Sequence, residues 1–325
     1  MLAYIGKRIL QFIPVFIGAT LILFFFRAVI PGDPVKLIAG ERDLPEAIYQ
    51  QIVANHHLDE PMYVQYGYYM SDLLHGDLGT SLQRKLPVLN IFAEKFPYTA
   101  RLALCAICVE ILIGLSAGII SAVKKYSFLD ALVTISTSVL VSVPAFWLGM
   151  LLQMFFGIFL KNVTGGAVSL PVSGAGAISS YPVWMHYILP AITLASVSLA
   201  YTARIMRSQL LEVMNADYIR TALAKGLSKR AVIMKHALKN AMIPVITFIG
   251  IDFGSMMSGA ILTETIFSWP GIGFEIFRAI GQRDWPIVMG GVILVVFVVM
   301  IINLIIDISY AFFDPRIRYG KKAGD

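Results

Sequence analysis

Six long apolar segments divide this chain of 325 residues. They cover residues 9–30, 100–123, 132–160, 188–203, 241–262 and 287–313. A helix needs about 20 apolar residues to cross the hydrocarbon core of a bilayer, and five of the segments reach that length. The segment 188–203 is shorter and rich in Ala, Ser and Thr, which is typical of a helix packed tightly against its neighbours. The pattern predicts an all-α membrane protein in which residues 1–325 form one domain with six transmembrane helices.

The charged residues give these helices an orientation. Only 14% of the residues are charged, against about a quarter in soluble domains. Of the 26 basic residues, 16 fall in alternate segments: two at 7–8, two at 124–125, eight between 204 and 239, and four between 316 and 322. The positive-inside rule therefore places both termini in the cytoplasm, and it supports the short fourth helix, because the eight clustered basic residues would otherwise lie outside. Bilayer orientation explains the net charge of +6 better than nucleic-acid binding does.

The outer segment 31–99 carries two further helical patterns. Residues 45–56 place isoleucine and valine at helical spacing, and residues 61–74 place tyrosines, methionines and a leucine along one face. Tyrosine favours the boundary between membrane and water. We expect two short amphipathic helices on the outer surface, which either pack on the membrane helices or dock a partner.

The sequence lacks the motifs of the common catalytic centres. It contains no G-x-x-x-x-G-K-[ST] phosphate loop, no G-x-S-x-G nucleophile elbow and no H-E-x-x-H zinc motif. The five histidines show no chelating pattern, and Cys105 and Cys108 are expected to be small core residues inside an apolar run. We predict no catalytic residue, no metal site and no cofactor in this chain, which is therefore not an enzyme. If ATP drives its activity, another chain hydrolyses that ATP.

The basic loop 204–240 predicts a helix, a glycine turn and a second helix. The first helix covers 217–225, and Gly226 suits a left-handed C-cap because glycine tolerates positive φ. Ser228 is a plausible N-cap for the second helix, 229–240. Such an element either fits a groove on a cytoplasmic partner or lies on anionic lipid.

Three acidic residues fall inside apolar segments, where charge is costly and usually faces a cavity or a partner. Glu110 lies midway along the second segment, and Asp252 midway along the fifth. We hypothesise that both line a translocation path and favour cationic groups; the alternative is that they pair inside the bundle or are protonated. Asp307, near the inner end of the sixth segment, is expected to meet Arg204 or Arg207.

The outer loop before the sixth segment contains Trp269-Pro270-Gly271 and suits a re-entrant turn. Irregular backbone near membrane depth must be buried in protein or line water. Residues 267–274, and among them Phe267, Trp269 and Pro270, are therefore a candidate outer gate.

The basic loop also resembles a known family. Tyr218-Ile-Arg-Thr-Ala-Leu-Ala-Lys-Gly-Leu-Ser228 and then His236-Ala-Leu-Lys-Asn-Ala-Met-Ile-Pro244 are similar to the EAA loop of ABC importer permeases, in the version of the dipeptide, oligopeptide and nickel importers. Four other segments resemble that family in the same order along the chain: 31–34, 76–79, 263–273 and 314–318.

The match to the generic signature is incomplete at two places. Arg220-Thr221 stand where the generic pattern has Glu-Ala, and Pro244 lies several residues after the place of its closing Leu-Pro. Ala222 and Gly226 match. The departures leave open which side chains make the main contacts.

The resemblance implies a permease subunit in the bacterial inner membrane. Two related permeases would form the pore, two ATPase chains would bind ATP and Mg²⁺ beneath them, and an extracytoplasmic binding protein would deliver peptides. Nickel complexes, glutathione and haem are the alternative substrates within the family. The coupling helix on the ATPase would consist of Tyr218, Ile219, Arg220, Thr221, Ala222, Leu223, Ala224, Lys225 and Gly226. Other classes are an ion-coupled carrier or channel, and a membrane scaffold or signalling protein.

Overall fold

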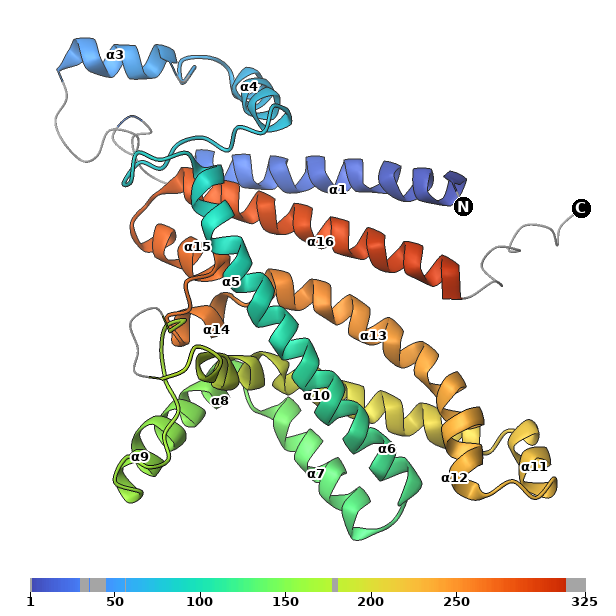
Figure 1. Ribbon diagram of the computed structural model, residues 1–325. Coiled ribbons are helices and arrows are strands. Elements are labelled where there is room, and N and C mark those ends of the chain that lie inside the picture. Colours follow the sequence, from blue (N-terminus) through green and yellow to red (C-terminus); the bar gives the residue numbers. More distant parts are fainter. Residues whose placement is uncertain (1, 30–34, 36–44, 56, 177–180, 314–325) are drawn as a thin grey trace, which may run out of the picture.

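The computed structural model describes residues 2–29, 35, 45–55, 57–176 and 181–313. These residues form helices joined by turns and contain no strand (Figure 1). The helices before the third membrane segment are α1 (Leu2–Val29), α3 (Glu46–Asn55), α4 (Met62–Leu74), α5 (Val88–Val109) and α6 (Ser116–Val123). Those that follow are α7 (Phe128–Ser142), α8 (Ala145–Leu152), α9 (Leu160–Val163), α10 (Met185–Met214), α11 (Asp217–Ala224), α12 (Lys229–Val232), α13 (Leu238–Gly259), α14 (Ile261–Ile266), α15 (Ile272–Gly281) and α16 (Trp285–Phe313). Three π-helical segments, η1 (Glu110–Leu115), η2 (Gln153–Phe159) and η3 (Ile233–Ala237), continue α5, α8 and α12 without a break.

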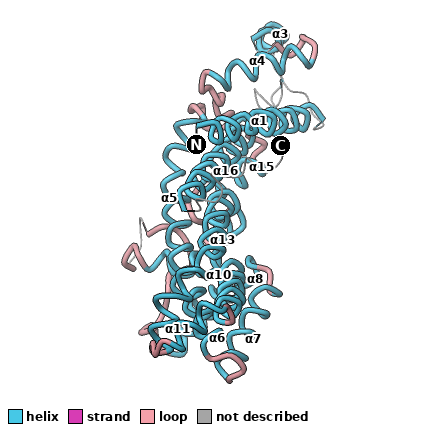
Figure 2. The backbone as a smooth tube through the Cα atoms, turned by 90° about the vertical axis from the view of Figure 1, so that its right-hand side faces the viewer, coloured by secondary structure: helices cyan, strands magenta, loops and turns pink. Residues whose placement is uncertain are grey.

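Six helical stretches are long and apolar enough to cross a membrane, as the hydrophobic pattern predicts. They are Arg8–Phe26, Val88–Val123, Ala145–Val163, Met185–Met214, Lys229–Met257 and Trp285–Ile306. The start of α1, the end of α16 and the turn around α11 lie at the same end of the bundle (Figure 1), and Figure 2 views the molecule from that end. The all-α, six-helix prediction is confirmed.

Several helices extend beyond the apolar segments. The helix that contains 100–123 begins at Val88, so the end of the predicted outer segment 31–99 is helical. The first part of the predicted loop 204–240 belongs to α10. Its predicted second helix is the beginning of the long helix that becomes the fifth span. Polar residues end the hydrophobic pattern but not the helix, because lysine, arginine and glutamate are good helix formers.

The third apolar segment, 132–160, is not one helix. Val143 and Pro144 separate α7 from the stretch α8–η2–α9. Proline has no N–H to donate, and it forces the preceding residue out of the helical region. Val143 accordingly has φ −91° and ψ 125°. The prediction of one continuous span is therefore corrected to two helices that meet at Pro144.

The helix α10 lies at the centre of the bundle and contacts α5, η1, α6, α7, α8 and α13 (Figure 1). In the apolar stretch of α10, 56% of the residues are buried. In the apolar stretches of the other five candidate membrane spans, at most 28% of the residues are buried. Small side chains on α10 allow this packing, among them Ala195, Ala200 and Ala203, which are all buried. The tight packing predicted from the Ala-, Ser- and Thr-rich segment is confirmed.

The closest approach to α10 is made by two glycines spaced four residues apart, Gly114 and Gly118. A Cβ atom on Gly118 would lie 2.6 Å from the carbonyl oxygen of Ala203 and 2.7 Å from the Cβ of Met206. On Gly114 it would lie 3.1 Å from the carbonyl oxygen of Leu199. This is the small-xxx-small contact of membrane helices, in which van der Waals packing replaces the hydrophobic effect.

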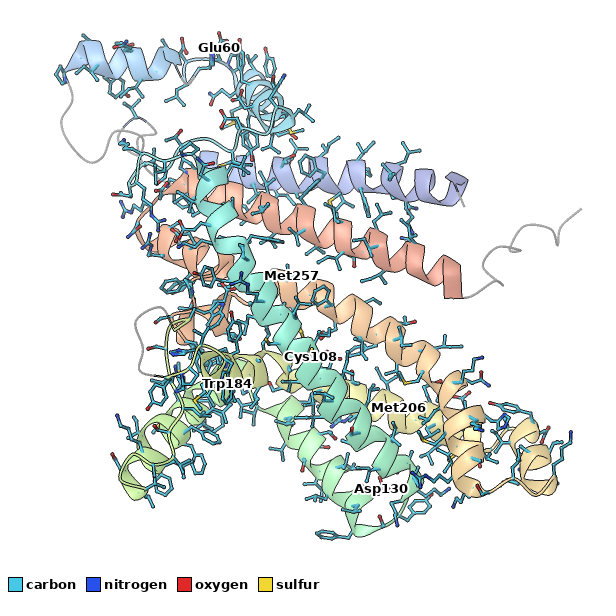
Figure 3. The ribbon with its side chains drawn as sticks, in the orientation of Figure 1. Glu60, Cys108, Asp130, Trp184, Met206 and Met257 are labelled. Atoms are coloured by element: carbon cyan, nitrogen blue, oxygen red, sulfur yellow. The ribbon has the colours of Figure 1, made fainter. Side chains whose placement is uncertain are left out.

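An ion pair holds the hairpin of α6 and α7 against α10. Arg207 Nε and Nη2 donate to Asp130 Oδ1 and Oδ2 at 2.8 and 2.9 Å, and Ser121 also donates to that carboxylate. Figure 3 labels Asp130 near the end of this hairpin. Arg204 binds the hydroxyls of Thr137 and Ser138 on α7. Both arginines thus bind α7. The prediction that one of them meets Asp307 stays a prediction, because the side chain of residue 307 lies outside the described residues.

The two amphipathic helices of the outer segment are present as α3 and α4, except that residue 56 is outside the described residues. The tyrosine face of α4 packs on α1. Tyr66 and Thr20 share a hydrogen bond of 2.9 Å between their hydroxyls, and the ring of Phe24 contacts Tyr66 and Tyr69. Of the two alternatives, packing on the membrane helices and docking of a partner, the first is observed for the tyrosine face of α4.

The turn between α14 and α15 is built around the buried carboxyl group of Glu264. Thr99 donates to its Oε1 at 2.6 Å, and the backbone N–H of Phe274, in the first turn of α15, donates to Oε2 at 2.9 Å. A Cβ on Gly271 would lie 2.3 Å from Glu264 Oε1, so only glycine leaves room for the carboxyl group. Burial raises the pKa of Glu264 to about 7.

The contact at Gly118 predicts a sharp difference between two glycine-to-alanine substitutions. Gly118→Ala should lower the free energy of unfolding by about 1–3 kcal/mol, because the methyl group overlaps Ala203 and Met206. Gly18→Ala in α1, where no atom lies within 4 Å of the added Cβ, is the matched control and should not destabilise. Thermal unfolding of the purified chain in detergent measures both. Equal stability of the two variants would contradict the packing described for α6 and α10.

The raised pKa of Glu264 predicts a pH dependence of stability. The folded chain holds this proton up to about pH 7, whereas the ordinary pKa is 4.5. The folded state therefore binds more protons than the unfolded state in this interval, and stability should fall as the pH rises from about 4.5 to about 7, by up to roughly 3 kcal/mol. The Glu264→Gln variant should lack this part of the pH profile, and Glu60→Gln, at an exposed glutamate, should keep it. Parallel melting curves at pH 5 and pH 8 make the comparison.

Candidate functional site

The segment between α10 and α12 is a helix–glycine–helix turn, as the loop pattern predicts. Gly226 has φ +84°, and its N–H donates to the carbonyl oxygen of Leu223 at 2.9 Å. The N–H of Leu227 donates to the carbonyl oxygen of Ala222 at 3.4 Å. Ser228 caps the next helix by accepting a hydrogen bond from the N–H of Ala231 at 3.3 Å. The predicted glycine and serine caps are confirmed.

One face of α11 is fixed to the bundle. Ile219 is 2% exposed and packs in an apolar cluster with Leu210, Val232 and Ala237. Asn240 Nδ2 donates to the Tyr218 hydroxyl at 2.8 Å. Of the nine residues predicted to couple to an ATPase, Ile219 is therefore an anchor that faces its own chain, and Ala222 is half-buried beside the same cluster.

The remaining side chains of this turn are exposed and include apolar and basic groups. Leu223 and Leu227 are 45% and 42% exposed. The exposed predicted residues are Tyr218, Arg220, Thr221, Leu223, Ala224, Lys225 and Gly226. The turn projects from the end of the bundle where α1 begins (Figures 1 and 2). Its geometry is that of a rigid protrusion that can bury two leucines and place cations against a partner.

The structure brings Glu110 and Asp252 together in the bundle interior. Glu110 is fully buried at the start of η1, and Thr202 on α10 donates to its Oε1 at 2.5 Å. Asp252 on α13 interacts with Glu110 and with the hydroxyl group of Ser198. The arrangement agrees with the alternative of pairing inside the bundle, whereas a path-lining role for these carboxyl groups stays a prediction.

The predicted outer-gate residues lie at the centre of a packed cluster. Phe267 and Trp269 are 1% and 0% exposed, and Pro270 is half-buried. Trp269 Nε1 donates to the carbonyl oxygen of Tyr98 at 3.1 Å, and the Trp269 ring meets that of Tyr187 edge-on at 4.6 Å. These contacts hold the turn between α14 and α15 inside one chain. A gating role for these residues stays a prediction.

One sequence-based expectation about these residues is wrong, and one buried carboxyl group was not anticipated. Cys108 is exposed on the outside of α5 and is not a core residue, whereas Cys105 is half-buried (Figure 3). The described residues contain no group of three or more His, Cys, Asp or Glu side chains placed to hold a metal ion. Sequence reasoning also missed Glu264, although this residue belongs to the segment 263–273 that carried the family resemblance.

Comparison with known proteins identifies the family. Residues 114–319 match the model of the binding-protein-dependent transport system inner membrane component, and residues 1–103 match the N-terminal model of such membrane components. One solved structure, described as an amino acid ABC transporter with histidines, superposes with a TM-score of 0.51 at 13% identity and covers 70% of this chain and 94% of its own. That likeness concerns the fold alone.

Full-length relatives agree with the family models. The chain is 41% identical to the dipeptide transport system permease protein DppB of Escherichia coli strain K12, over 99% of this chain and 100% of the relative. It is 43% identical to DppB of Alkalihalophilus pseudofirmus, over 98% and 100%. The glutathione transport system permease protein GsiC of Escherichia coli O6:H1 is 38% identical over 98% and 100%. This multi-pass membrane chain therefore belongs to the family of binding-protein-dependent transport system inner membrane components.

Proposed function

We propose that the chain is one permease half of an ATP-driven importer of dipeptides or similar short peptides in the bacterial plasma membrane. The observation that carries the proposal is the rigid, exposed turn formed by α11. The full-length relatives of the chain support the proposed substrate class, since they are permeases of dipeptide and glutathione transport systems. The positive-inside pattern supports a cytoplasmic position for this turn and for both termini.

The proposed partner of α11 is a separate ATPase chain, which binds ATP and Mg²⁺. Helix-in-groove recognition buries apolar anchors in a cleft and surrounds them with polar contacts. Leu223 and Leu227 are the exposed anchors on this turn, with Arg220 and Lys225 beside them. Closure of two ATPases on ATP would then move α11 as a solid body, and it would move α10 and α13 with it.

A homologous second permease would supply the other half of the pore, and an extracytoplasmic binding protein would deliver the peptide. Nickel complexes and haem have no relative among those described above, whereas glutathione has one. Glutathione is itself a small peptide, so it is the second candidate substrate. Adding dipeptides or glutathione to the reconstituted importer with its binding protein, and measuring stimulated ATP hydrolysis, separates the two.

The exposed face of α11 predicts that Leu223→Ser weakens binding to the ATPase chains by about tenfold, equivalent to ~1.4 kcal/mol, because a buried apolar anchor is lost. Stability of the permease itself should not change, since the residue is 45% exposed. The matched control is Leu74→Ser at an exposed leucine of α4. Co-purification of the ATPase chains measures the effect. Full co-purification with the Leu223 variant would mean that α11 is not the contact.

The buried anchor predicts a different defect. Ile219→Ala should loosen α11 on the bundle at a cost of about 2–4 kcal/mol, while the surface that meets the ATPase is kept. ATPase chains should still co-purify, but less peptide should be taken up per ATP hydrolysed. Ile219→Val, which removes one methyl group, is the milder control. Uptake of labelled dipeptide and phosphate release are measured in the same proteoliposomes. An unchanged ratio of uptake to hydrolysis in Ile219→Ala contradicts the anchoring role.

A further inference from the structure

The interior of the bundle contains two carboxyl groups that the proposed coupling mechanism does not use. Glu110 begins the π-helical segment η1, and Asp252 lies on α13. The helix α10 contacts both η1 and α13, and it contributes Ser198 and Thr202, one turn apart. Figure 3 labels Cys108, two residues before Glu110, and Met206, one turn after Thr202, and so marks this depth of the bundle.

The carboxyl oxygens of this cluster outnumber the hydrogen-bond donors available to them. The hydroxyl of Thr202 donates to Glu110 Oε1 at 2.5 Å. Glu110 Oε2 and Asp252 Oδ2 are both buried from solvent and have no hydrogen-bond partner. A buried acceptor without a donor costs about 1–3 kcal/mol, and more if it is charged.

Among the described side chains that interact with this pair, none carries a compensating positive charge. Among the described residues, the groups that interact with this pair are the two carboxyl groups themselves and the hydroxyls of Thr202 and Ser198. Arg204 follows on α10 but is hydrogen-bonded to Thr137 and Ser138. Two carboxylates are acceptors only, so as ions they repel each other and leave both free oxygens without a donor.

We propose that Glu110 and Asp252 form a binding site for one monovalent cation, and that this cation is a proton shared between the two carboxyl groups. One proton turns one acceptor into a donor, supplies the missing hydrogen bond and leaves a single negative charge on the pair. A divalent metal ion fits the site less well. Ca²⁺ takes six to eight oxygen ligands and Mg²⁺ takes six, whereas the cluster offers two carboxyl groups and two hydroxyls.

The site connects the helices on either side of the coupling turn. The helix α10 precedes α11, and α13 continues the helix that follows it. Any rearrangement that separates Glu110 from Asp252 breaks the shared hydrogen bond and leaves two carboxyl groups without it. The proton therefore favours the conformation in which η1, α10 and α13 are in contact. This inference stands whether or not the proposed function is correct.

Infrared spectroscopy of the full-length chain in nanodiscs tests the proposal, because the carbonyl stretch of a protonated carboxyl group is distinct from that of a carboxylate. The wild-type spectrum should contain this band, and Glu110→Gln and Asp252→Asn should each lose one carboxyl equivalent of it. Difference spectra between the wild type and each variant cancel the signal of Glu264, which all three chains retain. The two amide variants should keep the wild-type melting temperature, since an amide N–H replaces the shared proton as the donor. Glu110→Ala and Asp252→Ala should melt at lower temperature.

Three results would contradict the proposal that Glu110 and Asp252 share a proton. The first is a protonated-carboxyl band of equal size in the wild type and both amide variants. The second is a melting temperature of the amide variants as low as that of the alanine variants. The third is a rise in wild-type stability when sodium replaces potassium at constant ionic strength, which identifies a metal ion as the occupant. This last measurement needs no variant, so a variant that fails to fold leaves the proposal testable.

Discussion

The close contact between α6 and α10 is the constraint on which the rest of the bundle depends. At Gly118 two helix backbones approach so closely that a single methyl group has no room. Without a hydrophobic driving force in lipid, such surface complementarity must hold membrane helices together. Because α10 contacts α5, η1, α6, α7, α8 and α13, its position sets the positions of these helices.

Polar groups complete the structure at both ends of the bundle. Arg207 and Asp130 join α10 to α7 at one end of the bundle, and Glu264 organises the turn before α15 toward the other end (Figure 1). In each case a charged or ionisable group is satisfied by several donors or acceptors, as buried polar groups require. The pair of Glu110 and Asp252 is one exception, because two of its buried oxygens lack donors. A group that breaks this rule in a membrane is a candidate for function.

Features that depend on residues close together in the sequence, such as helices and helix caps, could be predicted. Long apolar runs gave six helices, and Gly226 and Ser228 marked a helix end and a helix start because each cap depends on one residue type. The break at Pro144 was missed because the apolar run continues across it. Pairs such as Thr99 with Glu264, and Arg207 with Asp130, join residues far apart in the sequence. A single sequence contains no signal that such residues meet. Pairing of Glu110 and Asp252 inside the bundle was therefore only one of the alternatives at the level of sequence, and their contact came from the structure.

The continuity of the helix after Ser228 has a mechanical consequence. From Lys229 to Asp252 the chain forms one uninterrupted helix through α12, η3 and α13. At about 1.5 Å per residue this stretch is roughly 35 Å long, so moving its Lys229 end sideways by one helical pitch, about 5.4 Å, tilts it by roughly 9°. A flexible linker at this place would absorb such a motion. A continuous helix converts the displacement of one end into a tilt of the whole helix. The segment around Asp252 therefore tilts by the same angle.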